Sequence, residues 1–156
     1  AYVLDELRNN PTSRRILINI WNPVVMDQMS LTPCACQYQF YVNNGKLSCQ
    51  MYQRSADMFL GVPFNITSSA LLTNILAKYS GLKPDKLIIC FGDAHVYESH
   101  MDAVVKQMTR KSRPFPILRI GDEHGKIPDN IEELEYEHFK LIGYEPHPSI
   151  KAKMVA

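Results

Sequence analysis

The alternation of apolar and polar residues in the first half of the chain predicts a β-hairpin. Two extended runs, residues 37–42 and residues 46–54, flank the turn sequence Asn43-Asn44-Gly45. Asparagine and glycine tolerate the positive φ angles of tight hairpin turns. In the second run polar side chains alternate with apolar ones, which are Leu47, Cys49 and Met51. One face of this hairpin should therefore be buried.

Three segments carry apolar residues at helical spacing. Residues 2–7 are amphipathic from the first position without a capping residue, so the sequence is expected to enter partway through a helix that ends near Pro11. Residues 65–79 have apolar side chains every three or four positions, and Gly81 is suited to end a helix there. We predict that this segment is the central core helix and that residues 98–109 form another helix.

Extended runs between these helices indicate further strands. They are residues 16–21, 86–91, 114–120 and 136–142, with a polar loop around residues 121–130. The run 86–91 is mostly apolar and is typical of a buried strand. Strands and helices interleave without a strict βαβ repeat or a glycine-rich phosphate loop. The pattern predicts a layered α/β (α+β) fold with a mixed β-sheet packed against helices.

Composition limits the class of protein. A chain of 156 residues with 46% hydrophobic residues can bury one sizeable core, so a single domain over residues 1–156 is expected. The formal net charge of +1 favours a local anion site over a broad nucleic-acid surface. No apolar run approaches the ~20 residues that span a bilayer, and no signal peptide opens the sequence. These features predict a soluble, cytoplasmic protein.

The four cysteines are too few for a disulfide scaffold in a chain of this length. Cys34 and Cys36 are close in sequence, but no second pair and no suitably spaced histidines complete a zinc site, so no metal is expected. Three of the cysteines lie in apolar, strand-like stretches and are expected to be small buried hydrophobes, namely Cys36, Cys49 and Cys90.

Cys34 is the strongest candidate for chemistry. It follows Pro33, and the segment Gln-Arg-Ser-Ala-Asp at residues 53–57 lies further along the chain. A thiol matched with an anion-binding arginine suits nucleophilic attack on a phosphorylated substrate, because the thiolate is the nucleophile and cations stabilise it. A buried structural cysteine is the alternative. An enzyme is the leading hypothesis.

Several longer blocks resemble one protein family, in the same order along the chain. They are Ser13-Arg14-Arg15, Trp21-Asn22-Pro23, Pro33-Cys34, residues 39–42, residues 45–48, residues 52–57, residues 60–66, residues 92–97 and Ile150-Lys151. On these blocks the chain resembles the carboxy-terminal three-fifths or so of thymidylate synthase. The resemblance implies that family's fold and its reaction. In that reaction dUMP is reductively methylated to dTMP, with 5,10-methylenetetrahydrofolate as the donor of one carbon and a hydride, and dihydrofolate is released.

The resemblance implies four catalytic residues. Cys34 would add to C6 of the uracil ring, while Arg54 would stabilise charge and hold the phosphate with its planar fork of donors. Asn65 would face O4 and N3 of the pyrimidine, and Asp57 would accept hydrogen bonds from the pterin ring of the folate. Without the resemblance, Asn65 would be interpreted as an N-cap of the helix that follows it.

The resemblance also implies two binding sets. The dUMP set is Arg14, Arg15, Gln53, Arg54, Ser55, Asn65, His95 and Tyr97. The folate set is Asp57, Leu60, Gly61, Phe64 and Ala156. In the first set His95 and Tyr97 would hold the deoxyribose hydroxyl, and their i, i+2 spacing puts both side chains on one face of an extended segment. The tail from Lys151 onward would fold over the ligands, whereas a frayed terminus is the simpler interpretation.

By the resemblance, the catalytic unit is a homodimer in which Arg14 and Arg15 reach the neighbouring subunit's site. Read alone, this arginine pair is ordinary solvated surface. No membrane and no obligatory nucleic acid is expected as a partner.

Two features depart from the family pattern. Ala35 stands where the family usually has histidine, and the family's amino-terminal portion, with its catalytic glutamate, is absent from this sequence. Two alternatives stay open. One is a pyrimidine deoxynucleotide hydroxymethylase of the same superfamily, which captures the intermediate with water. The other is an inactive homologue that serves in dimerisation or RNA binding.

Overall fold

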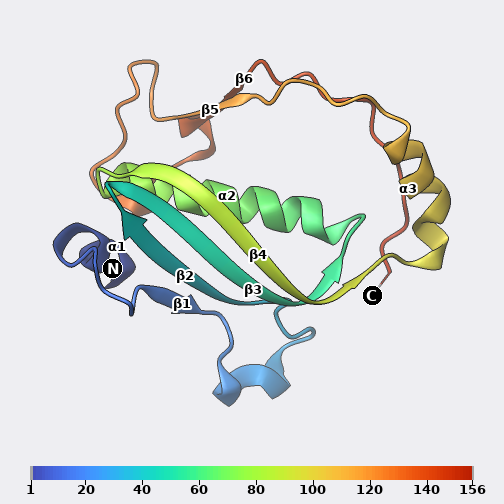
Figure 1. Ribbon diagram of the computed structural model, residues 1–156, viewed down its shortest axis with the longest axis horizontal. Coiled ribbons are helices and arrows are strands. Elements are labelled where there is room, and N and C mark those ends of the chain that lie inside the picture. Colours follow the sequence, from blue (N-terminus) through green and yellow to red (C-terminus); the bar gives the residue numbers. More distant parts are fainter. Residues whose placement is uncertain (1, 156) are drawn as a thin grey trace. The chain divides into compact units, whose positions relative to one another are not determined.

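The computed structural model describes residues 2–155 and builds the predicted hairpin from two long strands (Figure 1). Strand β2 (Ala35–Asn43) pairs antiparallel with β3 (Lys46–Asp57). Asn44 and Gly45 between them have φ angles of 49° and 70°, the left-handed values that the turn requires. The hairpin prediction is confirmed. Its buried face is confirmed as well, since 0% of the surface is exposed at Leu47, Cys49 and Met51.

A four-stranded mixed sheet forms around the hairpin. Strand β1 (Leu17–Asn19) lies antiparallel beside β2, and β4 (Lys83–His95) lies parallel beside β3, which gives the order β1-β2-β3-β4. Parallel neighbours need a crossover connection, and helix α2 (Gly61–Tyr79) supplies it between β3 and β4. The predicted mixed-sheet α/β architecture is therefore confirmed, although β1 covers only the middle of the predicted run 16–21.

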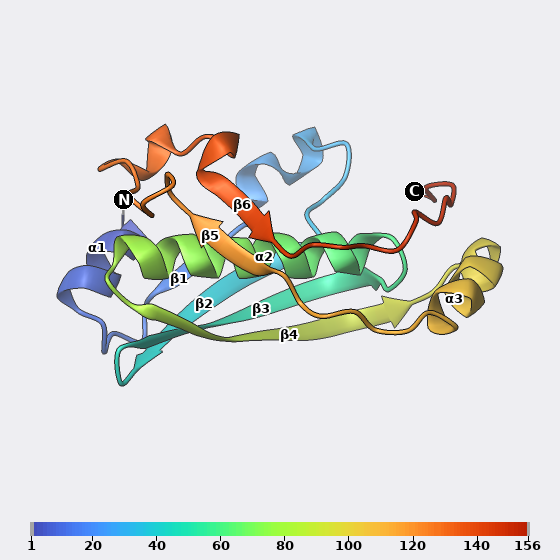
Figure 2. The same ribbon diagram turned by 90° about the horizontal axis from the view of Figure 1, so that it is seen from above.

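Helix α2 lies along one face of the sheet, as Figures 1 and 2 both show. The hydroxyl groups of Ser69 and Thr73 are buried and donate to backbone carbonyls one turn earlier, those of Asn65 (2.7 Å) and Ser69 (2.8 Å). Burying them therefore leaves no donor unsatisfied. The prediction of a central core helix is confirmed, with a buried face formed by Val62, Ser69, Thr73, Leu76, Ala77 and Tyr79.

Helix α2 begins earlier than the pattern predicted. The sequence predicted residues 65–79 with Asn65 as an alternative N-cap, but the helix begins at Gly61 and Asn65 lies inside it, so the N-cap interpretation is wrong. The Asp57 carboxylate accepts hydrogen bonds from the backbone N–H groups of the two residues before the helix (3.1 and 3.3 Å). Pro63 lies in the first turn, where a missing N–H costs no helical hydrogen bond.

Strand β4 is longer and less buried than expected. The run 86–91 predicted a buried strand, but none of the β4 residues is buried. In the described part of the chain β4 is the last strand of the sheet, with α2 on only one of its faces. Cys90 on this strand is consequently exposed, and Cys36 is half-buried, so the prediction of buried thiols is wrong at both positions. It is right for Cys49, where burial raises the pKa of the thiol.

Helix α1 (Tyr2–Asn9) ends before Pro11, as predicted. Leu7 is buried on its inner face, and Arg8 Nε donates to the carbonyl of Tyr79 in the last turn of α2 (2.9 Å). That carbonyl is one of the helix-end acceptors without a partner inside the helix. The short 3-10 helix η1 (Pro23–Gln28) follows β1.

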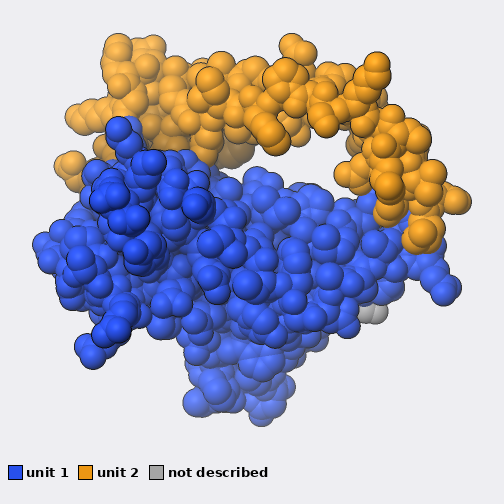
Figure 3. All heavy atoms as spheres, viewed as in Figure 1, with its two compact units in different colours: residues 1–100, 154–156 blue, residues 101–153 orange. Residues whose placement is uncertain are grey.

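The chain divides into two compact units, coloured separately in Figure 3. The first holds all elements above and the 3-10 helix η2 (Glu98–His100). The second spans residues 101–153 and contains helix α3, an antiparallel pair of strands and two 3-10 helices, which are α3 (Met101–Met108), β5 (Ile117–Ile120), η3 (Ile131–Glu133), η4 (Tyr136–His138) and β6 (Phe139–Ile142). The predicted helix 98–109 is thus a 3-10 turn followed by a shorter α-helix. Within residues 2–155 no helix combines the length and apolar character that crossing a bilayer requires.

Candidate active site

Arg54 holds the loop that carries the Cys34 thiol. Cys34 directly precedes β2, and its carbonyl accepts a hydrogen bond from the backbone N–H of Arg54 on β3 (2.8 Å). The guanidinium donates to the two preceding residues of the loop. Its Nε donates to the Pro33 carbonyl (3.1 Å), and its Nη2 donates to the carbonyl and the hydroxyl of Thr32 (2.7 and 2.8 Å). The structure thus brings a half-buried cation against the two residues that precede the half-buried Cys34.

Trp21 supports the same loop. Its indole Nε1 donates to the Pro33 carbonyl (3.1 Å), and the Arg54 guanidinium lies 5.9 Å from the centre of its ring, within the range of a cation–π contact. Among residues 2–155 none of the hydrogen bonds of Arg54 uses Nη1, so its two hydrogens are available to an anion. Sequence reasoning assigned no role to Trp21, which lies in one of the family-like blocks, or to Thr32, which directly precedes another.

Two amide side chains form the next part of the site. Gln53 is 1% exposed, and its Nε2 donates to Asn65 Oδ1 (3.0 Å) and to the Ser55 carbonyl (2.9 Å). Both Nε2 hydrogens are used, while Gln53 Oε1 is buried without a hydrogen-bond partner among residues 2–155. Because Asn65 Oδ1 faces Gln53, its Nδ2 is the donor left for a ligand. The pair therefore offers a ligand one acceptor, Gln53 Oε1, and one donor, Asn65 Nδ2.

Asp57 lies at the end of β3, where α2 begins. One of its oxygens, Oδ1, accepts the two backbone N–H groups before the helix, which leaves Oδ2 for a ligand. Gly61 separates this carboxylate from Asn65. A Cβ atom at Gly61 would lie 3.5 Å from Asp57 Cβ and 3.8 Å from Asn65 Oδ1, which are ordinary contact distances.

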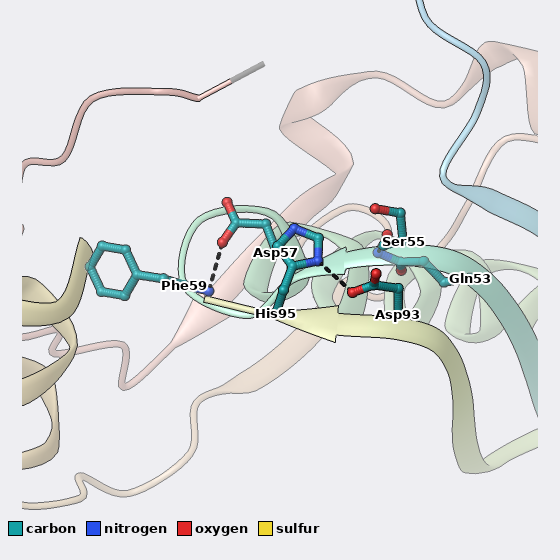
Figure 4. Close-up of polar contacts among 6 residues, drawn as sticks. All are labelled: Gln53, Ser55, Asp57, Phe59, Asp93 and His95. Atoms are coloured by element: carbon teal, nitrogen blue, oxygen red, sulfur yellow. Dashed lines mark hydrogen bonds and ion pairs between the residues drawn. The ribbon is translucent and has the colours of Figure 1, made fainter. Parts of the chain in front are cut away.

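His95 ends strand β4 beside Asp57, its partner in the parallel register. Its Nδ1 lies 3.0 Å from Asp93 Oδ1, as Figure 4 shows together with the contact between Asp57 and Phe59. The Tyr97 ring meets the imidazole edge to face at 5.1 Å, which agrees with the expected shared face of the i, i+2 pair. Asp93 was not among the predicted site residues, although the same i, i+2 rule points to it.

Gly92 permits the close approach of β4 to Arg54. A Cβ atom at Gly92 would lie 2.8 Å from the Arg54 carbonyl and 3.0 Å from the Tyr52 hydroxyl, both too close for any larger residue without a shift. The absence of a side chain here lets β4 pair with β3 along the segment that carries the site.

Arg14 and Arg15 are not brought to Cys34 within the chain. Both are exposed, and they lie just before Ile16, whose carbonyl accepts from the backbone N–H of Phe40 (2.8 Å). Phe40 is six residues beyond Cys34 along the extended chain, which corresponds to about 20 Å at the usual rise of a strand. The guanidinium groups of these two arginines therefore belong to another region of this subunit's surface.

The other predicted positions are spread around the start of α2. Ser55 is half-buried on β3, Leu60 is half-buried before the helix, and Phe64 in its first turns is 74% exposed. Ala35, at the position where the resemblance leads us to expect histidine, opens β2 opposite Gln53. Ala156 lies outside the described residues. Across residues 2–155 no three His, Cys, Asp or Glu side chains gather into a group able to hold a metal ion.

Fold and site together define a class of proteins. A mixed α/β sheet places a cysteine beside an arginine and next to a row of oriented hydrogen-bonding side chains, the arrangement expected of an enzyme that attacks an anionic, hydrogen-bonding substrate. The family model for thymidylate synthase matches residues 1–156. The chain belongs to the thymidylate synthase family, whose members are transferases of nucleotide biosynthesis and generally use methylenetetrahydrofolate.

Proposed function

We propose that this protein is a thymidylate synthase that converts dUMP to dTMP with 5,10-methylenetetrahydrofolate as co-substrate, and that residues 1–156 are part of one catalytic domain. The observation that carries the proposal is the hold of Arg54 on the Cys34 loop, with contacts from 2.7 to 3.1 Å. The thiolate is the reactive form of a cysteine nucleophile, and Arg54 keeps Nη1 for an anionic substrate next to this residue. Family membership supplies the reaction in which such a thiolate is used.

In the proposed reaction the Cys34 sulfur forms a bond to C6 of uracil, and the C5–C6 π electrons move toward C5 and the O4 carbonyl. C5 then forms a bond to the one-carbon unit while the bond between that carbon and N10 of the folate breaks. The C5 proton passes to a base or water as the bond between the carbon and N5 of the folate breaks, which leaves a methylene group at C5. The folate supplies that carbon and the hydride that reduces it to a methyl group, so dihydrofolate is released. The bond between sulfur and C6 breaks as the C5–C6 double bond forms again. Atoms and electrons balance without a metal or an external reductant.

The base-recognition part of the proposal rests on the two amides. Asn65 Nδ2 would donate to O4 of uracil and Oδ1, which keeps one lone pair beside Gln53 Nε2, would accept from N3–H. Gln53 orients that amide and offers its own unpaired Oε1 to a substrate or water donor. A base that lacks either hydrogen-bonding group of uracil would leave a buried polar group of the protein unsatisfied. This cost is the physical basis of strong discrimination between bases.

The phosphate and sugar of the nucleotide and the pterin of the folate would bind at the edges of the site. Arg54 Nη1 and Ser55 would bind the phosphate, and His95 with Tyr97 the sugar hydroxyl. The free Oδ2 of Asp57 would accept hydrogen bonds from the pterin N–H groups, with the folate passing the start of α2. The folate-side positions in this proposal are Asp57, Leu60, Gly61, Phe64 and Ala156.

A homodimer would complete the phosphate site. The sheet face away from α2 exposes large side chains, including Tyr41 (66%), Tyr52 (49%) and Ile88 (46%). Such a face is suited to a partner of the same kind, because aromatic and aliphatic side chains dominate stable interfaces. Arg14 and Arg15, which lie far from Cys34 in their own subunit, would then donate to the phosphate in the neighbouring subunit.

The test uses 5-fluoro-dUMP, whose fluorine cannot leave as a cation where a proton is normally lost. Incubation of the purified protein with this nucleotide and methylenetetrahydrofolate should raise the intact mass by that of both ligands. Cys34→Ser should form no adduct, while Cys90→Ser, the same substitution at an exposed thiol, should keep it. A wild-type protein without an adduct, or an adduct on Cys34→Ser, would remove Cys34 from its role.

Product analysis separates the proposal from hydroxymethylation. A thymidylate synthase forms dTMP and dihydrofolate in equal amounts. If water captures the one-carbon intermediate, the product is 5-hydroxymethyl-dUMP and the folate is not oxidised, a result that would contradict the proposed reaction while keeping the same nucleophile.

A further inference from the structure

Asp93 adjoins the proposed binding residues but has no role in the reaction described above. The parallel register pairs Asp93 with Ser55 and His95 with Asp57, so the ends of β3 and β4 present these side chains in one row. Alternate residues of a strand share a face, and Asp93 and His95 are two apart. Figure 4 shows the imidazole and this carboxylate turned toward each other.

The contact fixes the tautomer of His95. An ionised carboxylate can only accept hydrogen bonds, so at 3.0 Å from Asp93 Oδ1 the proton of the neutral imidazole lies on Nδ1. Nε2 is then the acceptor of the ring. The exposed fractions are 30% for the His95 side chain and 73% for that of Asp93, so the carboxylate acts mainly through this hydrogen bond and solvent screens its charge.

We propose that Asp93 is a positioning residue that presents His95 Nε2 as an acceptor to the sugar hydroxyl of the nucleotide. The proposal rests on the proposed function, in which His95 binds the deoxyribose. In dUMP the only free sugar hydroxyl is at C3′, because C2′ carries no oxygen and the 5′ oxygen carries the phosphate. Asp93 therefore influences a single contact of the ligand. A nucleotide that lacks this hydroxyl should bind equally well whether or not Asp93 is present.

The experiment compares dissociation constants for dUMP and for 2′,3′-dideoxy-UMP by titration calorimetry. Asp93→Ala should weaken dUMP binding about fivefold, because one hydrogen bond loses its orientation, and should leave dideoxy-UMP binding unchanged within about twofold. Asp93→Asn should keep most of the affinity, since its amide oxygen still accepts from Nδ1–H. Asp85→Ala removes the same charge at the other end of β4 and should bind both nucleotides like wild type.

A second background separates positioning from general structure. In His95→Ala protein the Asp93→Ala change should have no further effect on dUMP binding, because residues that act through one another are not additive. Equal weakening of both nucleotides by Asp93→Ala, or an unchanged dUMP affinity, would overturn the inference and leave the proposed function intact. A wild-type protein that fails to bind dUMP at all would overturn both.

Discussion

Replacing Gln53 by methionine or by glutamate separates hydrogen bonding from charge at the buried amide. Gln53 Nε2 gives both hydrogens to acceptors, Asn65 Oδ1 at 3.0 Å and the Ser55 carbonyl at 2.9 Å. Methionine has a similar volume but no donor. Glutamate keeps the shape and places a carboxyl oxygen against the two acceptors, and even when protonated it can donate only one hydrogen bond.

The magnitudes follow from the burial of this position, which is 1% exposed. Gln53→Met leaves two acceptors unpaired at about 1–3 kcal/mol each, partly offset because the unpaired Oε1 disappears, so we expect unfolding to become easier by about 2 kcal/mol at any neutral or mildly acidic pH. In Gln53→Glu, burial and the facing acceptors raise the pKa of the introduced carboxyl in the folded state. Each unit of that shift adds about 1.4 kcal/mol of destabilisation once the pH exceeds the folded pKa.

The sign of the pH dependence is fixed by linkage. The folded state of the glutamate variant binds its proton more tightly than the unfolded state does. Its stability is therefore greatest below the unfolded pKa, about 4.3 for a glutamate, and falls as the pH rises through the folded pKa.

Urea unfolding of wild type and both variants at about pH 5 and about pH 8 measures these differences in the free energy of unfolding. The glutamate variant should be clearly less stable than the methionine variant at the higher pH and should approach it at the lower pH. A methionine variant within about 0.5 kcal/mol of wild type would refute the buried hydrogen bonds. A glutamate variant with no pH dependence relative to methionine would refute the burial of its carboxyl group.

Three further changes test the site. Asn65→Asp should lower kcat/KM for dUMP and shift preference toward dCMP, because a carboxyl group accepts from the cytosine amino group and, when protonated, donates to N3. An unchanged ratio of kcat/KM for dUMP to that for dCMP would mean that the base is recognised elsewhere. Refolding Cys34→Ser and Arg15→Ala homodimers together should restore activity through hybrid dimers with one intact site, and hybrids that form but stay inactive contradict shared sites. Thr32→Val removes the hydroxyl that accepts from Arg54 Nη2 (2.8 Å) and should raise the KM for dUMP by about threefold to tenfold, whereas Thr32→Ser should keep it; a valine variant with the wild-type KM would mean that the hydroxyl does not orient Arg54.

Local chemistry made parts of the fold predictable from sequence. The hairpin follows from Asn44 and Gly45, which adopt the positive φ angles that few other residues tolerate. The start of α2 was predicted too late, because the apolar spacing becomes regular only beyond Pro63 and the stabilising acceptor is Asp57, four residues before the helix begins. The burial of β4 was predicted wrongly. An apolar run shows that a strand can be buried, but the exposure of β4 depends on which elements cover its two faces.

The candidate site residues can be proposed from the sequence, but the contacts that support them cannot. Cys34, Arg54 and Asn65 stood out by residue type and by resemblance to a family. The partners that hold them are distant in sequence: Thr32 is 22 positions from Arg54, and Gln53 is 12 from Asn65. Which of these pairs meet is decided by strand register, and register depends on the whole hairpin rather than on any local motif.

Strand direction explains why these segments converge. The parallel strands β3 and β4 both end at the same edge of the sheet, α2 begins there, and β2 starts there because it runs opposite to β3. Ligands of α/β proteins bind at the carboxyl ends of parallel strands for the same reason. Residues from four separate segments therefore meet at one place without any of them being close in sequence.

A single extra residue in β2 determines which residue of β3 lies beside Cys34. Along most of the hairpin the partner numbers of β2 and β3 follow one register, such as Gln37 with Tyr52, and continuing it would pair Ala35 with Arg54. The bulge at Cys36 shifts this register, so Ala35 pairs with Gln53 and the preceding carbonyl, that of Cys34, accepts from the Arg54 N–H at 2.8 Å. Without the bulge, the backbone of Cys34 would lie opposite the residue after Arg54 on β3. The irregularity in the ladder is therefore what sets the backbone of Cys34 against that of Arg54.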